Sequence, residues 1–129
     1  MGFLDAIFGK KKVLPVSVRD VKTFEAQVLK SDVPVIVDVW SDTCAPCKKL
    51  EPVLIEIATD YEGRVRVAEI HTSADPRLLA RLGVRATPTL LVFEGGEEVG
   101  RQTGFRPKEW FDQMIATEFG DSHHPSKQP

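Results

Sequence analysis

The two cysteines of the chain, Cys44 and Cys47, are separated only by Ala45 and Pro46. Two thiols this close together can form and break a disulfide with each other, which is the chemistry of thiol–disulfide exchange. A bridge across so short a loop removes little entropy from the unfolded chain and would add little stability. Two ligands are also too few for a closed zinc site, which takes four. The pair therefore predicts reversible redox chemistry.

The residues on either side of the pair predict its position in the fold. Residues 35–40 form an apolar run typical of a strand that is buried on both faces, and apolar residues at helical spacing follow up to Tyr61. Cys44 should then lie at a helix N-terminus, where unpaired N–H groups and the helix dipole stabilise a thiolate. Pro46 would lie in the first turn, where its missing N–H is no loss. We expect Cys44 to be exposed and Cys47 to be largely buried.

Asp38 is the only charged residue in the apolar run, six residues before Cys44. Burial disfavours an ionised carboxylate, so the pKa of Asp38 should be raised. A carboxyl group of this kind near the inner thiol could accept and return a proton during exchange. The alternative is an aspartate that is hydrogen-bonded to backbone or water at the end of its strand.

The period of the apolar residues predicts the order β-α-β-α-β-α-β-β-α without an internal repeat. Two parallel crossovers followed by a hairpin give a mixed sheet with helices on both faces. The expected strands are 16–18, 35–40, 65–70, 89–93 and 98–103, and the expected helices follow Asp20, Cys44, Asp75 and Pro107. A chain of 129 residues with 42% hydrophobic residues suits one domain, which we place at residues 15–120.

Charge and hydropathy exclude two classes of function. The formal net charge of −2 gives no reason to expect nucleic-acid binding. No apolar run approaches the roughly 20 residues that cross a bilayer. The first residues, MGFLDAIFGKKK, lack the pattern of a secretory signal, which predicts a cytoplasmic protein.

Two segments lie outside the expected domain. Residues 1–14 form a leader in which a short amphipathic helix could contact a membrane or a partner through residues 3–12; a mobile or locally packed leader is the alternative. Residues 121–129 are polar and should be disordered. His123 and His124 could bind a stray metal ion there, or belong to a solvated tail.

Six features together resemble the thioredoxin family over residues 16–120. They are Val37-Asp38 with Trp40, the pair Cys44-Ala45-Pro46-Cys47, Pro52 within the helix, Thr87-Pro88-Thr89, Gly96 in the hairpin, and Gly104 before the last helix. The resemblance implies an α/β thioredoxin fold, in which a central mixed five-stranded sheet is flanked by four helices. It also implies a thiol–disulfide oxidoreductase that reduces protein disulfides.

The resemblance further implies roles for individual residues. Cys44 would be the nucleophile, Cys47 the resolving thiol and Asp38 the proton acceptor and donor. Pro88 would be a cis-proline that faces the dithiol, and the backbone of Thr87 would pair with the client as an added strand. The residues expected to contact the substrate are Trp40, Thr43, Ala45, Pro46, Thr87, Pro88 and Gly104. The expected partners are disulfide-bearing clients and a protein reductase such as thioredoxin reductase, and we expect a monomer without metal or cofactor.

Three positions depart from the family pattern. Thr43 stands where a tryptophan is common beside the first cysteine, and Ala45 stands where glycine is common. Glu69 occupies a strand position near Asp38 where lysine is frequent. An anion in place of a cation should raise the pKa of Asp38 further, if the two side chains are close.

Two other functions remain open from the sequence. The first is a thioredoxin-fold module that binds clients or belongs to an assembly, with redox chemistry secondary. The second is a metal or iron–sulfur site shared between two chains.

Overall fold

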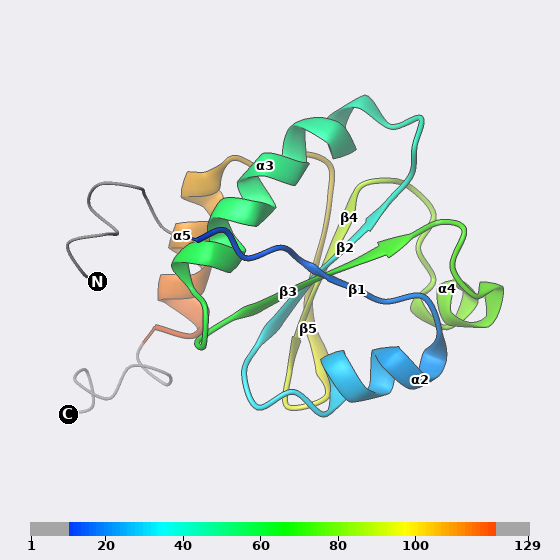
Figure 1. The fold of residues 1–129 in the computed structure, drawn as a ribbon, viewed down its shortest axis with the longest axis horizontal. Coiled ribbons are helices and arrows are strands. Elements are labelled where there is room, and N and C mark those ends of the chain that lie inside the picture. Colours follow the sequence, from blue (N-terminus) through cyan, green and yellow to red (C-terminus); the bar gives the residue numbers. More distant parts are fainter. Residues whose placement is uncertain (1–10, 121–129) are drawn as a thin grey trace.

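Five strands form one mixed sheet in the computed structural model, which describes residues 11–120 (Figure 1). The strands are β1 (Val16–Ser17), β2 (Val35–Trp40), β3 (Arg66–His71), β4 (Thr89–Glu94) and β5 (Glu97–Thr103). They lie in the order β1-β3-β2-β4-β5. The first three are parallel to one another, and β4 runs antiparallel to both β2 and β5. The mixed sheet expected from the two crossovers and the hairpin is confirmed.

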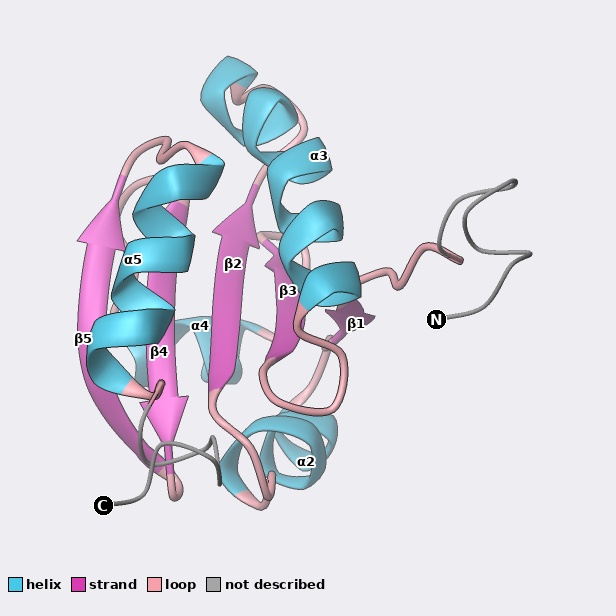
Figure 2. Ribbon diagram, turned by 90° about the vertical axis from the view of Figure 1, so that its left-hand side faces the viewer, coloured by secondary structure: helices cyan, strands magenta, loops and turns pink. Residues whose placement is uncertain are grey.

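The helices of the described part cover both faces of this sheet. They are α2 (Val21–Phe24), which continues as the π-helical turn η1 (Glu25–Leu29), α3 (Ala45–Asp60), α4 (Pro76–Leu82) and α5 (Lys108–Glu118). α3 and α5 lie on one face, and α2 and α4 on the other (Figure 2). The sequence predicted a single helix after Asp20. A hydrogen bond of 2.9 Å from the N–H of Lys30 to the carbonyl oxygen of Glu25 spans five residues and widens its last turn.

Strand β2 runs through the centre of the sheet and is buried on both faces, as its apolar run predicted. Val35, Val37 and Val39 pack among residues of α2 and α4, while Ile36 packs among residues of α3 and α5. Because successive side chains of a strand point to opposite faces, Asp38 shares the α3 face with Ile36. The single carboxylate of this strand is therefore placed under the helix that begins at the dithiol.

The two end segments extend beyond the described part. The predicted leader helix, the membrane contact through residues 3–12 and the predicted disorder of residues 121–129 fall wholly or largely on residues 1–10 and 121–129, which lie outside it. Within the described start of the chain, the N–H of Val13 donates a hydrogen bond of 2.9 Å to Oγ1 of Thr59 and holds this stretch against α3. Among residues 11–120, no helix is long and apolar enough to cross a membrane.

Candidate active site

Cys44 and Cys47 lie at the N-terminus of α3 and are joined by a disulfide, with their Cα atoms 5.2 Å apart. Cys44 is the residue that caps the helix, and its Sγ accepts a hydrogen bond of 3.2 Å from the N–H of Cys47. Cys47 is 3% exposed, as predicted, but Cys44 is only 8% exposed, so the expectation of an exposed Cys44 is wrong. Its side chain folds over the first helical turn as a cap and does not project into solvent. The surface around it is formed by Thr43, Ala45 and Pro46, all of which are exposed.

The loop that leads into β4 lies beside this turn. The peptide bond between Thr87 and Pro88 is cis, as the resemblance implied. Oγ1 of Thr87 lies 3.2 Å from Oγ of Ser41, which belongs to the loop that leads to the dithiol. The N–H of Gly104 donates a hydrogen bond of 2.8 Å to the carbonyl oxygen of Pro88. At Gly104 the backbone has a φ of +97°, which favours glycine. These bonds bring Thr87, Pro88 and Gly104 to the dithiol end of the sheet.

Asp38 is 5% exposed and lies within β2. Its Oδ1 atom has no hydrogen-bond partner among the residues that the structure describes, so no bond to the backbone is seen at this atom. Burial, followed by the charges of Glu69 and then Glu51, raises the pKa of Asp38 to about 7. The carboxyl group therefore titrates close to neutral pH, where a proton acceptor is most useful.

Asp38 and Cys47 line the same cavity, which has a volume of about 500 Å³. The charged residues around it are Lys48 and Glu51 from α3 and Glu69 from β3, so carboxylates outnumber cations there. Its other walls are mainly apolar and include Leu14 and Pro15 from the start of the described chain, Trp40, Leu54 and Ile55. A proton leaving Cys47 thus has a nearby carboxyl group in a largely apolar space.

Glu69 lies beside Asp38, as expected. The two residues are register partners on the parallel strands β3 and β2. The indole Nε1–H of Trp40 donates a hydrogen bond to Oε1 of Glu69. This bond could not be predicted from the sequence, because it depends on the alignment of two strands that are far apart in the chain.

His71 is a residue that the sequence analysis missed. Its ring packs edge-on against Trp40, with centroids 4.6 Å apart, and its Nε2 lies 3.1 Å from Oδ2 of Asp42. The N–H of Ser73 donates to Nδ1 of His71, which leaves Nε2 as the ring donor toward Asp42 when the imidazole is neutral. Alternation along β3 could have revealed it, since His71 is two residues after Glu69 and shares its face.

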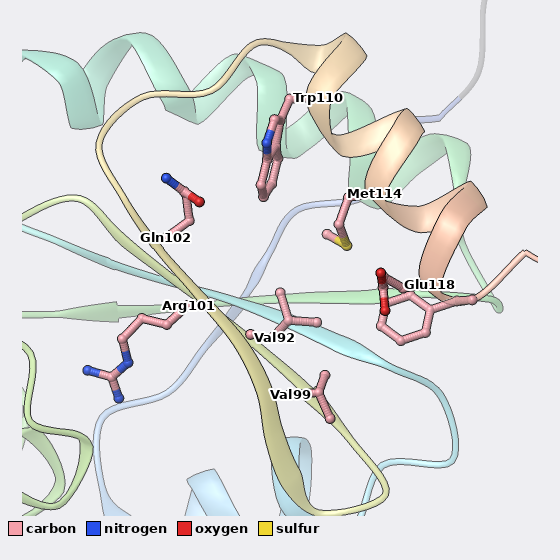
Figure 3. A pocket seen from close by; sticks show the side chains of 9 residues that line it. Val92, Val99, Arg101, Gln102, Trp110, Met114 and Glu118 are labelled. Atoms are coloured by element: carbon pink, nitrogen blue, oxygen red, sulfur yellow. The ribbon is translucent and has the colours of Figure 1, made fainter.

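A second cavity lies between β5 and α5 and has a volume of about 240 Å³ (Figure 3). Apolar side chains from Val92, Val99, Trp110 and Met114 form much of its wall. None of its lining residues belongs to the dithiol site, so the two cavities are separate. No group of three or more histidine, cysteine, aspartate or glutamate side chains is placed to hold a metal ion within residues 11–120.

Comparison with known proteins agrees with this geometry. The family model described as Thioredoxin matches residues 15–117. Thioredoxin 1 of a Nostoc species is 42% identical over 93 residues, which cover 72% of this chain and 87% of the relative. The thioredoxin of Rickettsia bellii is 38% identical over 98 residues, covering 73% and 93%. That of a Synechocystis species is 41% identical over 86 residues, covering 67% and 80%. The chain thus belongs to the thioredoxin family of thiol–disulfide oxidoreductases, and Cys44 and Cys47 are its redox-active pair.

Proposed function

We propose that the chain reduces disulfides of client proteins, with Cys44 as the nucleophile and Cys47 as the resolving thiol. The supporting observation is the position of Cys44 at the N-terminus of α3, with Cys47 more deeply buried one turn further on. The Cys44 thiolate attacks one sulfur of the client disulfide, forms a mixed disulfide and releases the other client sulfur as a thiolate. Cys47 then attacks Sγ of Cys44, and the second client sulfur leaves. Two electrons pass from the dithiol to the client.

Asp38 takes the proton that Cys47 must lose before it attacks. The supporting observation is that both side chains line the same cavity and that Asp38 titrates near pH 7. At this pH about half of the Asp38 carboxyl groups are ionised and able to accept a proton, while the other half can return one. The reverse transfer serves the reduction of the Cys44–Cys47 disulfide.

The client lies across the surface around Cys44. We assign this surface to Trp40, Thr43, Ala45, Pro46, Thr87, Pro88 and Gly104. The contacts of Ser41 with Thr87 and of Gly104 with Pro88 hold its separate loops at one end of the sheet. The client backbone pairs with that of Thr87 as an added strand, which accommodates many client sequences because main-chain hydrogen bonds supply the affinity.

The oxidised pair is reduced again by another protein, since the proposed cycle uses no cofactor of its own. We assign this role to a reductase of the thioredoxin reductase class and place the cycle in the cytoplasm, with the chain acting as a monomer. A reducing compartment keeps the dithiol available for the next client.

Turnover of an insulin-like disulfide substrate distinguishes a disulfide reductase from a module that only binds clients. With dithiothreitol as electron donor, we expect the protein to accelerate reduction well above the rate of dithiothreitol alone. The control is the protein with both cysteines replaced by serine, which has no thiol. A rate equal to that control would establish a binding module with no catalytic role.

The exposed Thr43 predicts weak docking to a generic thioredoxin reductase. Thr43→Trp places a large rigid apolar side chain beside Cys44 and should lower the apparent KM for the protein about fivefold, as expected for about 1 kcal/mol of added contact. The change in kcat should be smaller, because the added contact does not take part in the chemistry. Reduction by dithiothreitol serves as the control and should be equal for both forms. Equal KM values would show that docking relies on other residues.

A further inference from the structure

Four side chains form a compact group on the α3 face of the sheet beside the dithiol. On β2 they are Asp38 and Trp40, and on β3 they are Glu69 and His71. Asp38 is the register partner of Glu69, and Trp40 is the register partner of His71. In a parallel pair, register partners point to the same face and lie about 5 Å apart. The hydrogen bond from Trp40 to Glu69 crosses this group diagonally.

The hydrogen bond between Trp40 and Glu69 joins the proposed client surface to the group around the proposed proton acceptor. Trp40 is half-buried and belongs to the surface that we assign to the client. Asp38 is buried, and its Oδ1 has no hydrogen-bond partner within residues 11–120. Glu69 accepts the hydrogen bond of the Trp40 indole, and its charge acts on Asp38. It is therefore the one residue of the group that is linked both to the indole and to the carboxyl group.

We propose that Glu69 is a positioning residue of the exchange reaction: it ties the indole of Trp40 to the carboxyl group of Asp38, and makes proton transfer at Asp38 sensitive to what docks against Trp40. The inference rests on the proposed function, because it takes Asp38 as the proton acceptor and Trp40 as a client contact. It adds a residue and a coupling that the reaction scheme does not contain.

The charges around Asp38 give the direction of the coupling. From α3 it faces Glu51 and Lys48, from β3 it faces Glu69, and its partner on β4 is the apolar Leu90. Glu69 is the largest charge effect on Asp38, ahead of the exposed Glu51. The indole N–H partly balances the charge of Glu69. A client that draws the indole away from Glu69 leaves that charge stronger, and Asp38 then holds its proton to a higher pH.

A double-mutant cycle on the oxidised protein tests the coupling without any activity measurement. The free energy of unfolding is measured from pH 4 to pH 9, and the pH at which its slope against pH falls to half of the plateau value is the midpoint of the Asp38 titration in the folded protein. Glu69→Gln keeps an oxygen for the indole but removes the charge, and it should lower the midpoint by about one pH unit. Trp40→Phe keeps an aromatic ring but removes the N–H donor, and it should raise the midpoint.

The double variant Trp40→Phe/Glu69→Gln separates a coupling from two independent effects. It should have the midpoint of Glu69→Gln alone, because the indole acts on Asp38 only through the charge at position 69. Glu51→Gln is the matched control, because it removes a carboxylate from the same cavity, whereas the indole N–H donates to Glu69. Trp40→Phe should therefore raise the midpoint in this background as in the wild type. Additive effects of Trp40→Phe and Glu69→Gln would overturn the proposal, as would an unchanged midpoint in Glu69→Gln.

Turnover of the insulin-like substrate by the wild-type protein distinguishes the two levels of inference. Normal turnover with uncoupled midpoints overturns the role of Glu69 and leaves the proposed function intact. Coupled midpoints in a protein without turnover contradict the proposed function and not the link between Trp40 and Asp38. If Trp40→Phe does not fold, Trp40→Tyr supplies an aromatic side chain with a different donor position and should likewise lose its effect in the Glu69→Gln background.

Discussion

Replacement of Cys44 by serine should reduce turnover of protein disulfides by a factor of about 10³ or more. A serine hydroxyl is hardly ionised at neutral pH, even at a helix N-terminus, so no nucleophile remains to attack the client. Cys47→Ser should also stop turnover, but at the second step. Cys44 can still attack, and with no thiol to resolve the mixed disulfide the client stays covalently attached.

The two variants thus differ in whether they hold the client as a mixed disulfide. Mass spectrometry without reductant should find a one-to-one adduct of the client with Cys47→Ser and none with Cys44→Ser. The variant with both cysteines replaced is the control for non-covalent binding. Cysteine and serine side chains are nearly isosteric, and the Cys44–Cys47 disulfide closes a very short loop and so adds little stability. The fold should therefore persist in all three proteins. Capture by Cys44→Ser instead would reverse the assigned roles.

The position of the dithiol could be predicted from the sequence because local rules determine it. An apolar run of strand length comes before Cys44 and a helical pattern follows it, which is sufficient to place the pair at a helix N-terminus. The burial of Asp38 follows from the same run. The small exposure of Cys44 could not be predicted, because it depends on how its side chain turns when it caps the helix.

The group formed by Trp40, Glu69 and His71 shows where sequence reasoning ends. The resemblance to the family placed Glu69 near Asp38, but the sequence alone does not fix the register between β2 and β3. A shift by one residue would turn each side chain of β3 to the opposite face. The observed register depends on the packing of the whole sheet between two layers of helices, which no local pattern contains. The hydrogen bond of Trp40 and the ring contact of His71 both follow from it.

Replacement of Asp38 by asparagine should remove most of the decrease in stability that the wild type shows as the pH rises from about 4 to 7. In the unfolded chain the carboxyl group ionises near pH 3.8, whereas in the folded protein it keeps its proton up to about pH 7. Between these values the folded state binds more protons than the unfolded state, so a rising pH favours unfolding. A shift of about three pH units corresponds to about 4 kcal/mol, all of which is lost above pH 7.

Asparagine has nearly the same shape but no charge to bury. We therefore expect Asp38→Asn to be more stable than the wild type at pH 8, by about 2 kcal/mol or more after the cost of an amide with unpaired donors. At pH 4, where Asp38 is largely protonated in the folded protein, the variant should be no more stable than the wild type. Asp32→Asn removes an exposed carboxylate and serves as the control, which should leave the pH dependence unchanged.

The same variant should slow the resolving step by a factor of about 10² at pH 7, because the amide cannot accept the proton of Cys47. The release of the second client sulfur from a preformed mixed disulfide, followed in a single turnover, measures this step directly. In the wild type its rate should rise with pH through about 7 as Asp38 ionises, whereas in Asp38→Asn only the titration of Cys47 itself should remain. If Asp38→Asn is more stable than the wild type and resolves the mixed disulfide more slowly, the Asp38 carboxyl group serves the chemistry and lowers the stability of the fold. Lower stability at pH 8 with an unchanged rate would make Asp38 a structural residue, and the proton of Cys47 would then have to leave directly to solvent.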